Sequence, residues 1–582
     1  MIGLRAELAL AVGLFASAAA AQPTAASAPP APQPPPVSIP HEPARDTAIE
    51  VNTLSAPEGP PAGLLDSTNG GLGDDIWSGS ARGAIEEMLV RLPLATPIRS
   101  VRSLSRRLLL TKSEAPTGPA PRAFQTVRLQ ALLDAGFVSD TAKLAPLIEV
   151  KDAPEFPRVQ AEAILLGGTP ADACGAATEA RETEGERFWM QLRAYCYATA
   201  GKSDLLELTR GVMKAEGAAD KSFEILLDDV LTHKASSPGV LHDPTAVEVF
   251  LLRQLGLPLP AVLPAKFGLA GSVLVLRDVK SSPQARADAA TQAMHAGAAS
   301  TAELGAVADA QVFTPQQFAN AETAAAGLPF FQGQALIRQA VARASGDDEK
   351  AKLLAVALRL GRQNALLPVA AAMQAKGAAA FSPTTALRPF APAFAQALLL
   401  VREADAAERW RELLDVNNTS DKILAATLAV QLNLVAPNPG RTARAQEALG
   451  VLSQNSLSPQ PVGGFEAKEI AALALGLTDA LGETLTVDMK AQLANLVEHQ
   501  LPGRRLSTAA LKRLAETKDQ SGLKGEAILT LLDGIGPGGP GDLSPDTSAL
   551  IARTLKNWAE TDAARAFAID AFLLYRPQPA PS

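Results

Sequence analysis

The chain has 582 residues, of which 47% are hydrophobic and only 4% aromatic, and it carries a formal net charge of −8. This length suits several domains or one extended array. The modest acidic balance disfavours general nucleic-acid binding, which needs a concentrated basic surface, so we expect no nucleic-acid partner. Because aromatic residues are scarce, alanine and leucine supply most of the apolar surface. Both are strong helix formers, and the composition therefore predicts an all-α protein.

The first 21 residues have the features of a signal peptide. Arg5 precedes a short apolar run from Leu8 to Phe15, and Ala19 and Ala21 provide the small residues of a cleavage site. The run is too short to span a bilayer, which takes about 20 residues, and charges or prolines interrupt every later apolar stretch. We therefore expect a periplasmic or secreted protein with a cleavable signal peptide and no transmembrane span in the mature chain.

Residues 22–73 are predicted to form a disordered linker. The stretch Ala28–Pro36 is rich in proline, which fixes the backbone angle φ and lacks an N–H donor, and the glycine-rich stretch Asn69–Gly73 ends the segment. Such a sequence is typical of a semi-rigid spacer. The Pro-rich end of the chain, residues 576–582, is predicted to be a disordered tail.

A basic, amphipathic helix is predicted soon after the linker. Its apolar face begins at Ile98, and Arg99, Arg102 and Arg106 are spaced three and four residues apart, which places them on another face. Such a face suits an anionic lipid or polymer, so the three arginines are a candidate binding surface. An ordinary solvated helix face is the alternative.

The two cysteines of the chain, Cys174 and Cys196, lie in one local stretch. In an oxidising compartment we expect them to form a disulfide bond. Two buried, inert thiols are the alternative. Trp189, Tyr195 and Tyr197 surround the second cysteine, and this aromatic cluster either stacks on a sugar or peptide as a binding surface or fills the core of a helix pair.

Further along the chain, two helical stretches repeatedly flank a short break at small or charged residues, a pattern that predicts antiparallel helical hairpins. The expected pairs are 129–135 with 142–148, 188–200 with 205–213, 354–360 with 366–373, 394–401 with 407–414, and 555–559 with 563–574. Loop-like stretches divide the helices into three expected regions, 74–235, 236–435 and 436–575.

These hairpins resemble the tetratricopeptide-type helix-pair solenoids. The resemblance covers about five or six hairpins between Phe124 and Tyr575, and the 34-residue consensus unit of that family is absent. It implies an α-solenoid of irregular, stacked antiparallel hairpins. The chain also resembles uncharacterised exported helical proteins of alphaproteobacteria, which implies no function.

No pattern of reactive residues commits the chain to a chemical reaction. The histidines, among them His233 and His242, lack the spacing of a metal site, and the nucleophile motif G-x-S-x-G is missing. We therefore expect no catalytic residue, metal or cofactor, and a non-catalytic scaffold that binds a protein or polymer of the bacterial envelope. One alternative is a polysaccharide lyase or transglycosylase relative with a helical toroid, and another is a structural component of a surface appendage.

Overall fold

A computed structural model describes residues 59–92, 94–120, 122–150, 153–168, 172–175, 186–458, 466–517 and 520–576. These residues belong to one compact unit, 54–582. The predicted cleavage residues Ala19 and Ala21, the first part of the linker (22–58) and the tail beyond Arg576 lie outside the described residues.

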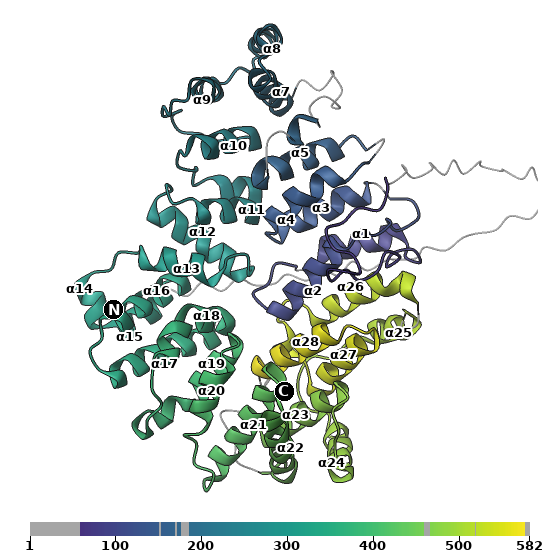
Figure 1. Cartoon of the computed structure of the whole chain (residues 1–582), viewed down its shortest axis with the longest axis vertical. Coiled ribbons are helices and arrows are strands. Elements are labelled where there is room, and N and C mark those ends of the chain that lie inside the picture. The colour runs from purple at the N-terminus through teal and green to yellow at the C-terminus, as the bar shows by residue number, and fades with distance from the viewer. Residues whose placement is uncertain are drawn as a thin grey trace, which may run out of the picture. The chain divides into compact units, whose positions relative to one another are not determined.

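The predicted all-α fold class is confirmed, because the described part of the chain folds into helices and contains no β-strand (Figure 1). The N-terminal helices are α1 (Arg82–Arg91), α2 (Arg99–Leu110), α3 (Phe124–Asp134), α4 (Val138–Leu144), η1 (Ala145–Leu147), α5 (Phe156–Gly167), α7 (Arg187–Thr199), α8 (Ser203–Ala215) and α9 (Lys221–Thr232). The central helices are α10 (Ala246–Leu255), α11 (Leu263–Arg277), α12 (Pro283–His295), α13 (Thr301–Asp309), α14 (Pro315–Ala319), α15 (Ala321–Gly327), α16 (Phe330–Arg343), α17 (Asp347–Gln363) and α18 (Leu367–Ala379). The remaining helices are η2 (Thr385–Phe390), α19 (Ala391–Leu400), α20 (Ala404–Arg411), α21 (Thr419–Val435), α22 (Pro439–Gln454), α23 (Ala467–Ala480), α24 (Val487–Glu498), α25 (Thr508–Thr517), η3 (Ser521–Leu523), α26 (Lys524–Ile535), η4 (Pro540–Asp542), α27 (Pro545–Asn557) and α28 (Thr561–Leu573).

All five predicted helix pairs form, and the two helices of each pair pack against each other: α3 with α4, α7 with α8, α17 with α18, α19 with α20, and α27 with α28. Each pair turns through one residue in the left-handed region: Gly136, Gly201, Ala365, Arg402 or Ala559. A left-handed residue after the last helical turn reverses the chain and lets it satisfy the open carbonyl groups of the helix end. The local turn residues, more than any repeat length, therefore define the hairpins.

The folded part of the chain begins before the expected boundary at residue 74. The backbone N–H groups of Leu64 and Leu65 donate to the carbonyl of Leu110, at 2.9 and 3.0 Å. The buried guanidinium of Arg128 donates to the carbonyl of Ala62 at 2.9 Å and to that of Leu109 at 2.6 Å. Residues 59–73 therefore lie along α2 and α3 and are not part of an extended linker.

Helix α28 joins the beginning, the middle and the end of the folded unit. It packs against α2, α19, α21, α23 and α27 (Figure 1). The carboxylate of Asp570 in α28 accepts a hydrogen bond from the backbone N–H of Ser100 at the start of α2, at 2.8 Å. Arg402, in the turn between α19 and α20, lies 3.8 Å from the same carboxylate.

No helix in the described part of the chain combines the length and the apolar character that crossing a membrane requires.

Candidate functional site

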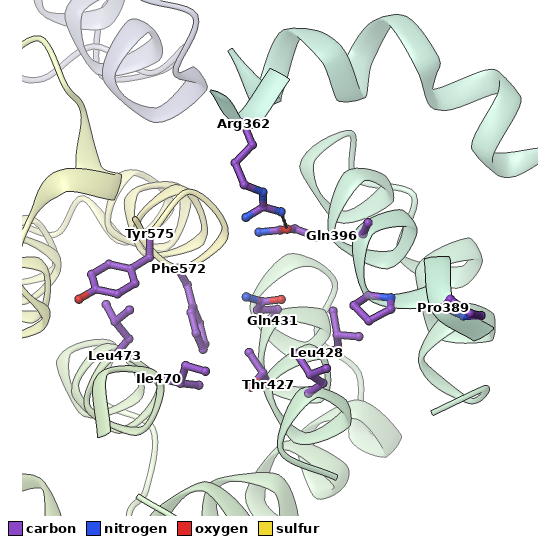
Figure 2. A pocket seen from close by; sticks show the side chains of 13 residues that line it. Arg362, Pro389, Gln396, Thr427, Leu428, Gln431, Ile470, Leu473, Phe572 and Tyr575 are labelled. Atoms are coloured by element: carbon purple, nitrogen blue, oxygen red, sulfur yellow. Dashed lines mark hydrogen bonds between the residues drawn. The ribbon is translucent and has the colours of Figure 1, made fainter. Parts of the chain in front are cut away.

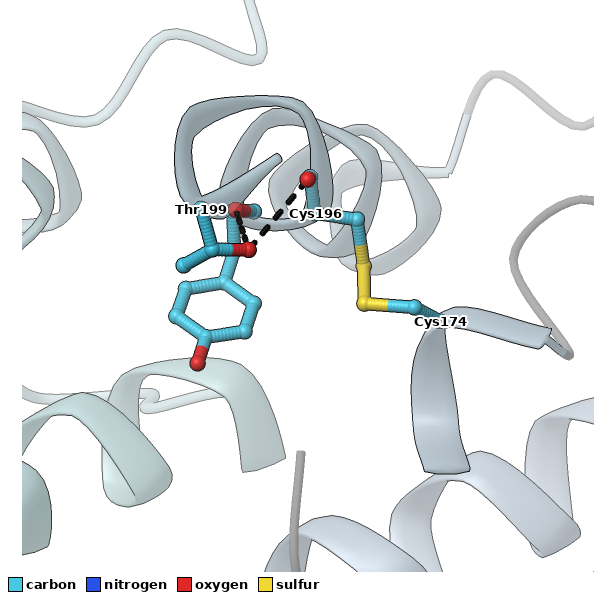
Figure 3. The surroundings of a disulfide bond; sticks show 4 residues. Cys174, Cys196 and Thr199 are labelled. Atoms are coloured by element: carbon cyan, nitrogen blue, oxygen red, sulfur yellow. Dashed lines mark hydrogen bonds between the residues drawn. A yellow bond between two sulfur atoms is a disulfide. The ribbon is translucent and has the colours of Figure 1, made fainter. Parts of the chain in front are cut away.

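The predicted disulfide is present and joins the residues around Cys174 to α7. The two Cα atoms lie 5.8 Å apart, and Figure 3 shows the bond beside the last turn of α7. The aromatic residues near it do not form a binding surface, which was one of the two interpretations of the cluster. Trp189 and Tyr195 are buried and Tyr197 is half-buried, and the ring of Tyr195 packs edge-on against Phe250 of α10. These rings therefore fill the core, which was the alternative interpretation.

The arginines of α2 do not form a free basic surface either. Arg102 donates to the carbonyls of Ala135 and Ala296, both at 2.8 Å. Arg106 forms a two-point ion pair with Asp140 at 2.6 and 2.7 Å. Only Arg99 of the three is exposed. The sequence pattern missed this result because the partners come from α4 and from two distant helix ends.

Acidic, histidine and cysteine side chains do not gather into a metal site in the described residues, where no group of three or more could hold an ion. His233 and His242 are both exposed.

The structure contains a cavity that the sequence did not indicate, with a volume of about 310 Å³. It lies where helices from well-separated parts of the chain meet (Figure 2). Its lining comes from the end of α17, from η2 and α19, from the middle of α21, from α23, and from the end of α28. The lining residues are Arg362, Pro389, Pro392, Ala393, Gln396, Leu424, Thr427, Leu428, Gln431, Ile470, Leu473, Phe572 and Tyr575. Apolar walls with a few placed polar groups are typical of ligand sites.

Gln431 is the unusual member of this lining. Its side chain is only 5% exposed, yet its amide has no hydrogen-bond partner among the residues that the structure describes. Each of the other glutamines that are buried in the described chain has at least one hydrogen-bond partner, although the Nε2 atom of Gln191 has none. These glutamines are Gln125, Gln191, Gln334 and Gln374. The polar atoms of Gln431 are not among the fully enclosed unpaired atoms of the described residues, so the amide faces the open space of the cavity and is available to a ligand or to water.

The position of Gln431 follows from the sequence of α21. This helix is buried on nearly all sides from Ala425 to Leu434, and Thr427 and Gln431 lie four residues apart, on one face. Thr427 satisfies its hydroxyl by donating to the carbonyl of Ile423 at 2.8 Å. The Gln431 side chain makes no such local bond in the described structure and lines the cavity instead.

Gln396 and Arg362 extend the polar wall. The Arg362 guanidinium donates to the side-chain carbonyl of Gln396 at 2.6 Å, and the Gln396 amide donates to the carbonyl of Leu573 at 2.6 Å. Arg362 is exposed, and no acidic side chain in the described part of the chain forms an ion pair with it. The cavity therefore has a positive charge without a counter-charge at one edge.

Tyr575 is the one lining residue with a titratable hydroxyl. Burial, together with Glu469, raises its pKa well above the ordinary value of 10. Figure 2 shows this hydroxyl on the side of the ring away from Gln396 and Gln431. The lining contains no carboxylate, histidine, lysine or thiol. It thus lacks the groups that usually transfer protons or act as nucleophiles at neutral pH.

The signal for this site in the sequence was the pair Thr427 and Gln431 inside an otherwise apolar helix. That pair alone does not identify a cavity, because Asn433 in the same helix is also buried and is satisfied by Thr442 at 3.0 Å. Comparison of the chain with models of known protein families, with curated proteins and with solved structures gives no match.

Proposed function

We propose that this protein is a non-catalytic helical scaffold of the bacterial envelope that holds a partner through the cavity around Gln431. The amide of Gln431 carries this proposal, because it faces the cavity with its donor and acceptor groups free of protein partners among the described residues. The lining offers an apolar surface, an amide and a positively charged guanidinium, and each of these can contact a partner. It offers no group with the pKa needed for acid–base work.

A location outside the cytoplasm is part of the proposal. The Cys174–Cys196 disulfide supports it, since such bonds persist in oxidising compartments. The signal-peptide pattern that ends at Ala19 and Ala21 supports the same location, periplasmic or secreted. Native protein taken directly from cells should therefore contain no thiol that an alkylating reagent can modify before reduction. Two modified cysteines would contradict the location.

The scaffold is proposed to be of the tetratricopeptide-like kind. Five helical hairpins, each reversed at a left-handed residue, support a fold built from stacked pairs. Their irregular lengths argue for a non-repeating array in which one special place, and not a uniform groove, binds the partner.

A polysaccharide-processing enzyme is the second candidate. It requires a cleft with a tyrosine and an arginine, and Tyr575 and Arg362 line the same cavity. The raised pKa of Tyr575 weighs against it, because a lyase base must lose its proton near neutral pH.

Photo-crosslinking in intact cells tests the binding proposal. p-Benzoyl-phenylalanine at Leu424, which lines the cavity, is compared with the same residue at the exposed Leu208 of α8. We expect an adduct from position 424 that is absent at 208 and that weakens when Leu428→Trp fills the cavity. Equal adducts at both positions, or none at 424, would reject the cavity as the binding site.

A further inference from the structure

The cavity around Gln431 has a row of polar side chains between apolar surfaces. Gln431, Gln396 and Arg362, from α21, α19 and α17, follow one another in Figure 2. Ile470, Leu473 and Phe572 lie on one side of this row, and Leu428 and Pro389 lie on the other (Figure 2). An occupant must therefore present an apolar body to the walls and polar groups, in a fixed order, to the row.

The first polar group of the occupant is defined by Gln431. A carboxamide has both N–H donors and a carbonyl acceptor, and in Gln431 neither has a protein partner among the described residues. An amide in the ligand offers one donor and one acceptor in return. A plain hydrocarbon chain would displace water from the Gln431 amide and leave it unpaired, which disfavours binding.

The second polar group is defined by Arg362. Its guanidinium uses one N–H for Gln396 and keeps further donors, and no acidic side chain of the described chain neutralises it. Guanidinium groups pair well with carboxylates, which accept two parallel hydrogen bonds. The order of the groups is then an apolar body, an amide and a carboxylate.

We infer that the cavity binds a ligand in which an apolar group is joined through an amide to a carboxylate, as in an N-acyl amino acid. This inference rests on the proposed binding role of the cavity and specifies its ligand. The same chemistry occurs in two sources, a free N-acyl amino acid and the end of a peptide with an apolar penultimate residue.

Calorimetric titration of the full-length mature protein with N-octanoylglycine tests the ligand class. Three comparison probes each lack one feature: N-octanoylglycinamide lacks the carboxylate, octanoyloxyacetate replaces the amide N–H by an ester oxygen, and decanoate lacks the amide. We expect each to bind about tenfold or more weakly, which corresponds to about 1.4 kcal/mol for each lost interaction. Equal affinity for all four probes would show a non-specific apolar site and overturn the inference.

Two variants assign the interactions to residues. Gln431→Leu should abolish the preference for N-octanoylglycine over the ester. Arg362→Gln should abolish the preference over N-octanoylglycinamide. Arg359→Gln, an exposed arginine one turn earlier in α17 that does not line the cavity, should change neither preference. If both preferences persist in Gln431→Leu and Arg362→Gln, and their melting curves show folded protein, the assignment is wrong.

A further titration with N-acetyl-leucyl-glycine distinguishes the two sources of the ligand, a free N-acyl amino acid and a peptide end. Tighter binding of this peptide than of N-octanoylglycine identifies a peptide end, and the reverse identifies an acyl amino acid; both results support the ligand class. Absence of binding for all these probes, while the adduct from position 424 persists in cells, would reject the ligand class alone. Loss of that adduct would reject the proposed function itself.

Discussion

At the scale of single residues, Gln431 and Gln334 are two buried glutamines that differ in hydrogen bonding. Both lie inside apolar helices and are nearly inaccessible to solvent. Gln334 donates to the carbonyl of Ala357 at 2.8 Å and accepts from the Gln374 amide at 3.1 Å, whereas Gln431 has no partner among the described residues. Gln334 therefore belongs to an enclosed hydrogen-bond network, whereas the Gln431 amide lines a largely apolar cavity without a protein partner among the described residues.

Replacing each glutamine by leucine should thus have opposite effects on the free energy of unfolding. Gln431→Leu removes an unpaired amide and should stabilise the unliganded protein by about 1 kcal/mol. Gln334→Leu leaves the partners of Gln334 unsatisfied and should destabilise it by about 1–3 kcal/mol. Urea unfolding of the two variants beside the parent measures both changes. A destabilised Gln431→Leu protein would mean that the amide already has a partner.

Asp570 makes the junction between α2 and α28 dependent on pH. Burial raises the pKa of its carboxyl group, although the N–H of Ser100 and the charge of Arg402 act in the opposite direction. An acid with a raised pKa in the folded state contributes stability at low pH and loses it as the pH rises through that pKa.

The difference in unfolding free energy between the parent and Asp570→Asn should therefore favour the parent most below pH 3.8, the ordinary pKa of the carboxyl group. It should decline as the pH is raised to 7, since asparagine does not titrate and other groups cancel in the difference. Urea titrations of both proteins at several pH values give this difference. Parallel profiles would show that the pKa of Asp570 is the same in the folded and unfolded states.

At the scale of helices, the turns determine where each hairpin forms. Gly136 and Gly201 have nearly the same positive φ, 73° and 69°. A Cβ at Gly136 would lie 2.8 Å from the Cβ of Ala298 and 2.9 Å from a methyl group of Leu269, whereas a Cβ at Gly201 would meet nothing within 4 Å. The two glycines share the backbone requirement and differ in packing.

Gly201→Ala should therefore cost only the backbone strain, on the order of 1 kcal/mol. Gly136→Ala should cost clearly more, because the α3–α4 turn must also move away from Ala298 and Leu269. Thermal unfolding, with retained helical circular dichroism as the control for folding, separates the two effects. Similar losses for both would show that the contact at Gly136 relaxes without cost.

The hairpins could be predicted because their signals are local. A break at small or charged residues between two apolar periodicities marks each turn, and the structure has a helix pair at every place where the sequence suggested one. The function of the arginines in α2 could not be predicted, because Asp140 and the carbonyl of Ala296 lie on other helices. Segment 59–73 was misassigned since Arg128, which holds it, lies in α3 and carries no local signal.

At the scale of the whole folded unit, the cavity depends on contacts between distant parts of the chain. Helix α28 packs against α19, α21 and α23, and Gln396 of α19 donates to the carbonyl of Leu573 at the end of α28. Sequence periodicity identifies the apolar face of each helix but not its partner across such separations. The cavity therefore became visible only in the folded structure, although Thr427 and Gln431 mark its polar side.

Native mass spectrometry of the protein, purified gently from the cells that make it, shows whether the cavity holds a ligand. We expect a bound species that adds a defined mass to the parent protein and is absent from Leu428→Trp, in which the cavity is filled. An identical spectrum for the two proteins, with no added mass or with the same added mass, would contradict a binding role for the cavity around Gln431.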